Sequence, residues 1–101
     1  MGDGAGLVKE LNPFLIDKNT EPSWETEVAK WYLIKNGKHY AVFRWDSKKD
    51  EYDRTYLLLD KETNQPVRDT RLLEGILCLF DCLETVKERD ERGTDEENGE
   101  A

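Results

Sequence analysis

The stretch "WYLIKNGKHYAVFRW", residues 31–45, decides the fold of this chain. Two runs rich in aromatic and branched aliphatic side chains meet at Asn36-Gly37, and an Asn-Gly pair in this setting predicts a β-hairpin. A two-residue turn at this pair requires positive φ at both central positions and fixes the pairing of the two strands. The predicted pairs are Lys35–Lys38, Ile34–His39, Leu33–Tyr40, Tyr32–Ala41 and Trp31–Val42.

Alternation of side chains along a strand then assigns each residue of the hairpin to a face. One predicted face carries Trp31, Leu33, Tyr40 and Val42. The other carries Val28, Tyr32, Ile34, Ala41, Phe43 and Trp45, with His39 near the turn. Neither face is polar, so we expect both faces of the sheet to need a cover.

The rest of the chain supplies further strands and one helix. "RTYLLLD" (54–60) is typical of a third strand, and "VRD" (67–69), after the turn "KETNQP", of a short fourth. From about Thr70 to about Arg89, apolar residues recur at helical spacing and cover about half of the helix circumference. They are Leu72, Leu73, Ile76, Leu77, Leu79, Phe80, Leu83 and Val86.

These elements predict an α+β fold, in which an antiparallel meander of three or four strands is packed by one long C-terminal helix. A length of 101 residues indicates a single domain. We place it at residues 7–89, with an N-terminal arm or short helix. The glycine-rich residues 1–6 are expected to be flexible, and the acidic residues 90–101 to form a disordered tail.

Charge and composition narrow the functional classes. The formal net charge is −8, and the Lys and Arg residues are scattered among acids, which disfavours direct binding to nucleic acid. Residues 1–20 lack the pattern of a signal peptide, and no apolar run is long enough to span a membrane. Cys78 and Cys82 fit free thiols in a reducing compartment, so we expect a cytoplasmic protein.

No motif for catalysis or for a cofactor stands out. His39 is the only histidine, and the sequence fixes neither an orienting acid nor a nucleophile beside it. The C-x-x-x-C pair lacks the usual zinc spacing, and the acidic run 46–53 lacks the glycine of a calcium-binding loop. We therefore expect no enzymatic activity, no cofactor and no metal.

A protein-binding role is the leading hypothesis. The helix covers one face, and we expect Phe14, Leu15 and Ile16 to cover part of the other, which leaves an exposed aromatic patch. The residues expected to bind a partner are Tyr32, Trp45 and Tyr52, with Asp46, Asp50, Glu51 and Asp53 as a charged rim.

The partner would be another protein with a basic surface, for example the groove of a nucleic-acid-binding protein. A small acidic domain with these features resembles, in general style, the virus- or plasmid-encoded regulators that inhibit a host protein by occupying its surface. The alternative is a structural homodimer or assembly subunit that pairs its spare apolar surface with itself.

Overall fold

The computed structural model describes the backbone of residues 9–100 and the side chains of residues 9–91. The predicted flexible segment 1–6 lies outside these residues. The described elements, in chain order, are a 3₁₀ helix η1 (Pro13–Leu15), five strands and a C-terminal helix α2 (Leu73–Glu100). The strands are β1 (Trp24–Glu25), β2 (Ala29–Asn36), β3 (Tyr40–Ser47), β4 (Arg54–Asp60) and β5 (Gln65–Thr70).

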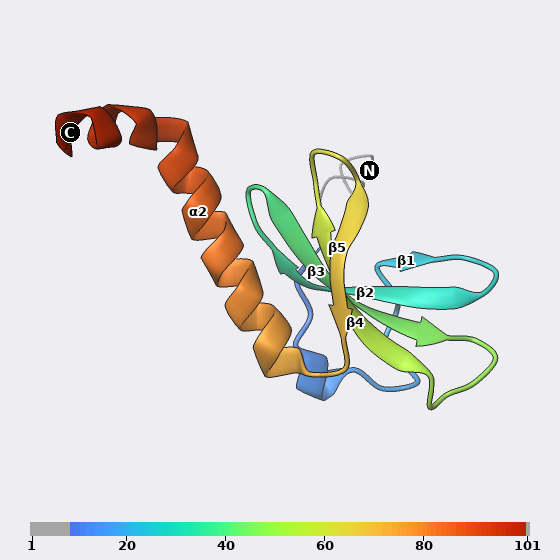
Figure 1. Ribbon diagram of the computed structural model, residues 1–101. Helices are drawn as coiled ribbons and strands as arrows, with labels where there is room; N and C mark the ends of the chain where they lie inside the picture. The colour runs from blue at the N-terminus through green and yellow to red at the C-terminus, as the bar shows by residue number, and fades with distance from the viewer. Residues whose placement is uncertain (1–8, 101) are drawn as a thin grey trace.

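The strands form one antiparallel meander in the order β1-β2-β3-β4-β5, and α2 packs against one face of it (Figure 1). The predicted α+β class and the helical cover are confirmed. The predicted number of strands, three or four, is wrong because β1 adds a fifth. This strand pairs Trp24 with Trp31 and Glu25 with Lys30. Two residues are too few to show the alternation by which a strand is recognised.

The core lies between the sheet and α2. Its buried cluster consists of Tyr32, Ile34, Tyr40, Val42, Leu58, Ile76 and Phe80. Val42, Leu58 and Ile76 are the largest side chains that are fully buried, and each such aliphatic side chain stabilises the fold by about 1.5–3 kcal/mol. Ile76 and Phe80 thus form the centre of the predicted apolar stripe, whereas Leu72 and Val86, at its ends, are exposed.

The helix begins and ends later than the sequence predicts. Thr70 belongs to β5, and its Oγ1 accepts a hydrogen bond from the backbone nitrogen of Leu72 at 3.0 Å, just before α2 begins at Leu73. At the other end α2 runs past Arg89 to Glu100. The segment from Asp90, predicted as a tail, is thus largely helical. Its Glu and Arg residues favour a helix even without an apolar stripe.

The β2–β3 hairpin forms as predicted, but its register is different. Trp31 pairs with Trp45, and Leu33 pairs with Phe43. Lys35 then pairs with Val42, so β2 carries an extra residue at Ile34, as in a β-bulge. The chain turns over residues 37–40, and no described glycine has a positive φ. The predicted two-residue Asn-Gly turn is therefore wrong.

The longer turn is explained by contacts with α2. Glu84 Oε2 accepts hydrogen bonds from the backbone nitrogens of His39 at 2.9 Å and Tyr40 at 2.8 Å. Gly37 lies so close to α2 that an added Cβ would meet the Glu84 carboxylate and stand 2.6 Å from Phe80 Cζ. A contact from a distant helix thus overrides the local turn preference.

The change of register also changes the faces, because a shift by an odd number of residues turns a strand over relative to its partner. Tyr32 and Ile34 now lie beside Tyr40 and Val42 in the core under α2. Trp31 and Leu33 are paired instead with Trp45 and Phe43, so these four side chains share the opposite face.

The last hairpin contains a second irregularity. Asn64 has φ of 62° in the β4–β5 turn, and its nitrogen donates to the carbonyl of Asp60 at 2.7 Å. In the ladder, Leu58 pairs with Arg68 and Leu59 with Pro66, which leaves Val67 as an extra residue in β5. The predicted strand at 67–69 is therefore part of a longer, bulged edge strand.

Candidate functional site

The sheet face away from α2 carries a continuous group of large apolar side chains, which we call the aromatic surface. Its members are Trp24, Trp31, Leu33, Phe43, Trp45, Leu57 and Leu59. Cross-strand pairing assigns them to this face, since Trp24, Trp31 and Trp45 are successive partners across β1, β2 and β3. Leu33, Phe43 and Leu57 follow the same rule across β2, β3 and β4.

The rings of the aromatic surface hold one another in place. The centroids of Trp24 and Trp31 are 4.8 Å apart, with their planes inclined by 30°. Phe43 meets Trp31 edge to face, with centroids 5.8 Å apart and planes at 83°. Such aromatic pairs contribute about 0.5–1.5 kcal/mol beyond the area they bury. The surface is therefore partly ordered before any partner arrives.

The aromatic surface is accessible in part. Trp24 is 55% exposed and Trp31, Phe43 and Trp45 are half-buried, whereas Leu33 is only 3% exposed. Leu33, Ala41, Phe43 and Leu59 line a shallow hollow of about 370 Å³. A second hollow of about 240 Å³ lies beside Trp45 and Val28. Large apolar patches of this kind are unusual on proteins that act alone.

The N-terminal arm does not cover this surface as the sequence predicts. Ile16 packs instead against the core on the α2 side of the sheet, as does Leu11. Phe14 is 82% exposed, and Leu15 is exposed as well. The prediction that these residues shield the second face is therefore wrong for the described part of the arm.

Tyr32 is predicted to bind a partner at the exposed face, and this prediction is wrong. It is only 3% exposed and lies in the core under α2, on the opposite face from Trp45. The guanidinium of Arg44 lies 5.7 Å from the centre of its ring. Burial raises the pKa of the Tyr32 hydroxyl, and the charge of Asp46 adds to this shift. The error follows from the register of the hairpin.

Asp46, predicted as part of the charged rim, is engaged inside the molecule. Its carboxylate accepts two hydrogen bonds from Arg44, both at 2.8 Å, and lies 3.8 Å from Arg54 Nε. Arg44 is buried, and the hydrogen bond to Asp46 raises the pKa of its guanidinium. Asp46 therefore neutralises a buried charge, a role that its position in the sequence does not reveal.

The other predicted rim residues lie in the β3–β4 loop, at the end of β3 that follows Trp45. The loop is closed by hydrogen bonds from the Ser47 nitrogen to the Asp53 carbonyl and from the Tyr52 nitrogen to Asp50 Oδ1, both at 2.9 Å. Tyr52 is 81% exposed. Asp50, Glu51 and Asp53 are exposed beside it. These four residues are therefore exposed, but Glu51 lines a hollow with Tyr32 and Arg44, on the face opposite Trp45, and the Asp53 carboxylate lies 3.8 Å from Arg71.

Trp24 belongs to the site although sequence reasoning did not single it out. It reaches the aromatic surface because β1 folds back on β2 and places it opposite Trp31. The available signal is a second tryptophan within hairpin distance of Trp31. The intervening residues 25–30 lack an Asn-Gly or Asp-Gly pair that would have marked the turn.

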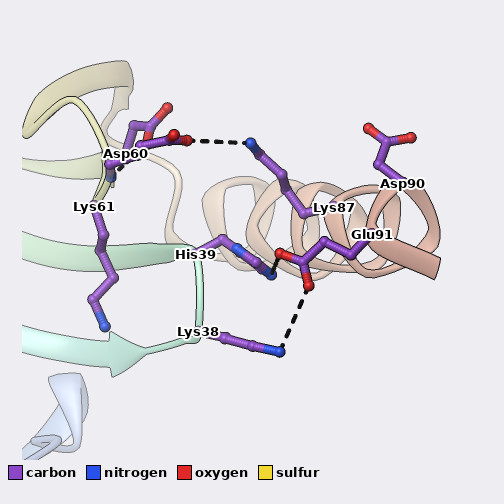
Figure 2. Close-up of a pocket in the computed structure, with 8 residues that line it drawn as sticks. Lys38, His39, Asp60, Lys61, Lys87, Asp90 and Glu91 are labelled. Carbon is purple, nitrogen blue, oxygen red and sulfur yellow. Dashed lines mark hydrogen bonds and ion pairs between the residues drawn. The ribbon is translucent and has the colours of Figure 1, made fainter.

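A third hollow, of about 520 Å³, lies between the β2–β3 turn and α2 (Figure 2). Its lining is ionisable throughout: Lys38, His39, Asp60, Lys61, Glu62, Lys87, Asp90 and Glu91. In Figure 2, the His39 ring and the Lys38 ammonium both point toward the Glu91 carboxylate. No pattern in the sequence indicates that the lone histidine meets acids of the helix.

Two further expectations concern the cysteines and membrane-spanning helices. Cys78 and Cys82 are free thiols and are exposed. Within residues 9–100, neither helix is both long enough and apolar enough to cross a bilayer.

Comparisons with other proteins leave the site to be interpreted from its own residues. No protein-family model matches the chain, and searches of curated proteins and of solved structures also give no match.

Proposed function

We propose that this chain is an acidic protein-binding module that docks through its aromatic surface onto a basic region of a partner protein. The observation that carries the proposal is the position of that surface, since α2 and the residues flanking η1 pack against the opposite face of the sheet. The module would act as a regulator or inhibitor by occupying the partner's basic region.

The composition of the aromatic surface favours a protein partner. Tryptophan is among the residues that dominate binding energy at protein interfaces, and one such side chain can bury about 150–250 Å². Trp31 contacts both Trp24 and Phe43, so these rings are already restricted and lose less side-chain entropy when a partner docks. Trp31 Nε1 is buried with no hydrogen-bond partner among the described atoms, which leaves an unsatisfied donor beneath the aromatic surface.

The charge of the chain favours a basic partner. There are 23 acidic and 15 basic residues, and several basic side chains are paired with acids of the same chain, such as Lys48 with Glu25 and Lys87 with Glu62. Asp50 and Glu51 remain exposed in the loop between β3 and β4. This excess of negative charge accelerates encounter with a positive surface and repels phosphate backbones.

The test uses Trp24→Ser, since this ring is exposed at the two-residue edge strand and its loss should leave the core intact. The matched control is Phe14→Ser, which removes a more exposed ring outside the aromatic surface. Wild-type and variant proteins, coupled to resin at equal density, are challenged with a lysate from the source cell. The retained proteins are quantified at about 0.05 and about 0.3 M salt.

The proposal expects a basic protein that binds wild type and Phe14→Ser equally, binds Trp24→Ser at least about tenfold less, and elutes at the higher salt concentration. Equal retention by all three proteins would refute the proposed role of the aromatic surface. Sedimentation of the purified chain distinguishes the alternative. A wild-type dimer that Trp24→Ser converts to a monomer would assign this surface to self-assembly instead.

A further inference from the structure

The hollow between the β2–β3 turn and α2 is lined by His39 and Glu91, and Glu88 lies beside His39. We propose that His39, Glu88 and Glu91 form a binding site for a divalent transition-metal ion of the zinc type. Their ligating atoms all lie within 4.8 Å of one another. The site is separate from the aromatic surface, so it does not depend on the proposed function.

The separations between these atoms suit a shared ion better than direct hydrogen bonds. His39 Nε2 lies 3.5 Å from Glu88 Oε2 and 3.4 Å from Glu91 Oε2. Nitrogen-to-oxygen hydrogen bonds are usually about 2.7–3.2 Å long. In a tetrahedral zinc site with bonds of about 2.0–2.2 Å, neighbouring ligand atoms are about 3.3–3.6 Å apart. The imidazole already stands at that spacing from each carboxylate, and the two carboxylates lie within 4.8 Å of each other.

The state of the histidine is a second, independent observation. His39 Nε2 is buried and has no hydrogen-bond partner among the side chains and backbone that the structure describes. The whole side chain is 14% exposed. A buried polar atom without a hydrogen bond calls for an explanation, and a bound ion is one of the usual ones. Figure 2 shows the ring directed toward Glu91.

The framework around the site is fixed without the ion. Glu84 holds the turn against α2 through hydrogen bonds from the backbone nitrogens of His39 and Tyr40. Glu84, Glu88 and Glu91 follow one another at intervals of four and three residues, so they lie on one face of α2. The turn and the helix therefore present their ligands to each other, which lowers the entropy lost on binding.

Lys38 shows how the site is balanced when no ion is bound. Its Nζ lies 3.6 Å from Glu88 Oε2 and 3.6 Å from Glu91 Oε1. The ammonium thus offsets the repulsion between the two carboxylates. Its side chain is largely exposed, so it can move into solvent when a divalent ion takes its place.

The ligand set selects the class of ion. Zinc and its neighbours accept imidazole together with carboxylates, whereas magnesium and calcium prefer oxygen ligands throughout. Three protein ligands leave the fourth position of a tetrahedral ion to water or to a group from another molecule.

Titration calorimetry with Zn²⁺ tests the site, supported by the absorption spectrum of bound Co²⁺. The experiment uses the full chain with Cys78→Ser and Cys82→Ser, because two exposed thiols could bind zinc by themselves. We expect one ion per chain. His39→Gln and Glu91→Gln should each weaken binding by at least about tenfold, and Lys38→Gln should strengthen it by removing the competing cation.

Glu62→Gln is the matched control, since it removes an acid from the same hollow that pairs with Lys87 rather than with His39. It should leave the affinity for Zn²⁺ within about twofold of the parent, well short of the loss expected for a ligand. Equal affinity of His39→Gln and its parent would overturn the proposal. So would equally tight binding of Ca²⁺ or Mg²⁺, because it would indicate attraction to acids alone. If His39→Gln unfolds, the exposed Glu91→Gln decides the question.

Discussion

Glu84 Oε2 on α2 lies 2.8 Å from the backbone nitrogen of Tyr40, in the turn that joins β2 to β3. The same oxygen accepts a hydrogen bond from His39, and the site of a Gly37 Cβ is taken up by this carboxylate and by Phe80. One helix side chain thus fixes the shape of a turn that is more than forty residues away in sequence.

Gly37→Ala should destabilise the protein. The new methyl group would displace Glu84 and press on Phe80, which is buried in the core. Overpacking of this kind costs about 1–3 kcal/mol, more than the roughly 0.4–1 kcal/mol gained by restricting the unfolded chain. Urea unfolding measures the difference. Gly75→Ala in α2 is the control, because its Cβ would meet Leu72 at an ordinary 3.8 Å and should stabilise the helix. Unchanged stability of Gly37→Ala would show that the turn does not need this close approach.

Glu84→Ala should cost more stability than Glu84→Gln. Alanine leaves the turn nitrogens of His39 and Tyr40 without an acceptor, at a cost of about 1–3 kcal/mol, whereas glutamine keeps one amide oxygen in reach. Amide hydrogen exchange at Tyr40 should accelerate in the alanine variant. Asp81→Ala, which removes an exposed acid from the same helix, provides the comparison. Equal losses of stability in Glu84→Ala and Asp81→Ala would show that the Glu84 carboxylate does not hold the turn.

Asp46→Asn should destabilise the fold by about 1.5–3 kcal/mol, since the buried guanidinium of Arg44 would lose its charged partner. Replacing Arg44 by Met in the same chain should recover part of the loss, because no uncompensated charge then remains. Thermal and urea unfolding of the single and double variants measure this. Asp53→Asn, whose exposed carboxylate lies 3.8 Å from Arg71, should cost less than about 1 kcal/mol. Equal losses of stability in Asp46→Asn and Asp53→Asn would contradict the role of Asp46 as the charged partner of buried Arg44.

Tyr32 should ionise at a higher pH than is ordinary for a tyrosine hydroxyl. Burial disfavours the phenolate, and the neighbouring Asp46 charge acts in the same direction, so the pKa of Tyr32 lies above the ordinary value of about 10. Because the folded state holds this proton more tightly, its contribution to stability is complete below about pH 10 and is lost as the pH rises through the raised pKa. The tyrosinate absorption of wild type and Tyr32→Phe shows whether the late-titrating hydroxyl belongs to Tyr32. A late-titrating band that persists in Tyr32→Phe would refute the assignment.

The sequence predicts those features of the fold that depend on local pattern. The period of Ile76, Leu79 and Leu83 marks the helix, and alternating apolar runs mark the central strands. The pairing of Trp31 with Trp45 could not be predicted in this way. It depends on the contact of Glu84 with the turn, which joins segments that local rules treat as independent.

The same limit applies to the candidate sites. Tyr52 is exposed, as is typical of a loop residue, but Tyr32 lies in the core because the register differs from the predicted one. His39, Glu88 and Glu91 meet only through tertiary packing. A lone histidine and two helical acids carry no recognisable spacing until the turn is seen against α2.

The bulge and the proline in β5 have a consequence for how copies of this chain behave when crowded together. An outermost strand with free backbone groups can template fibre growth by recruiting another molecule. Pro66 has no N–H to offer such a newcomer, and the extra residue at Val67 breaks the regular ladder. At the opposite margin β1 ends after two residues. Both margins of the sheet are therefore poor templates for polymerisation.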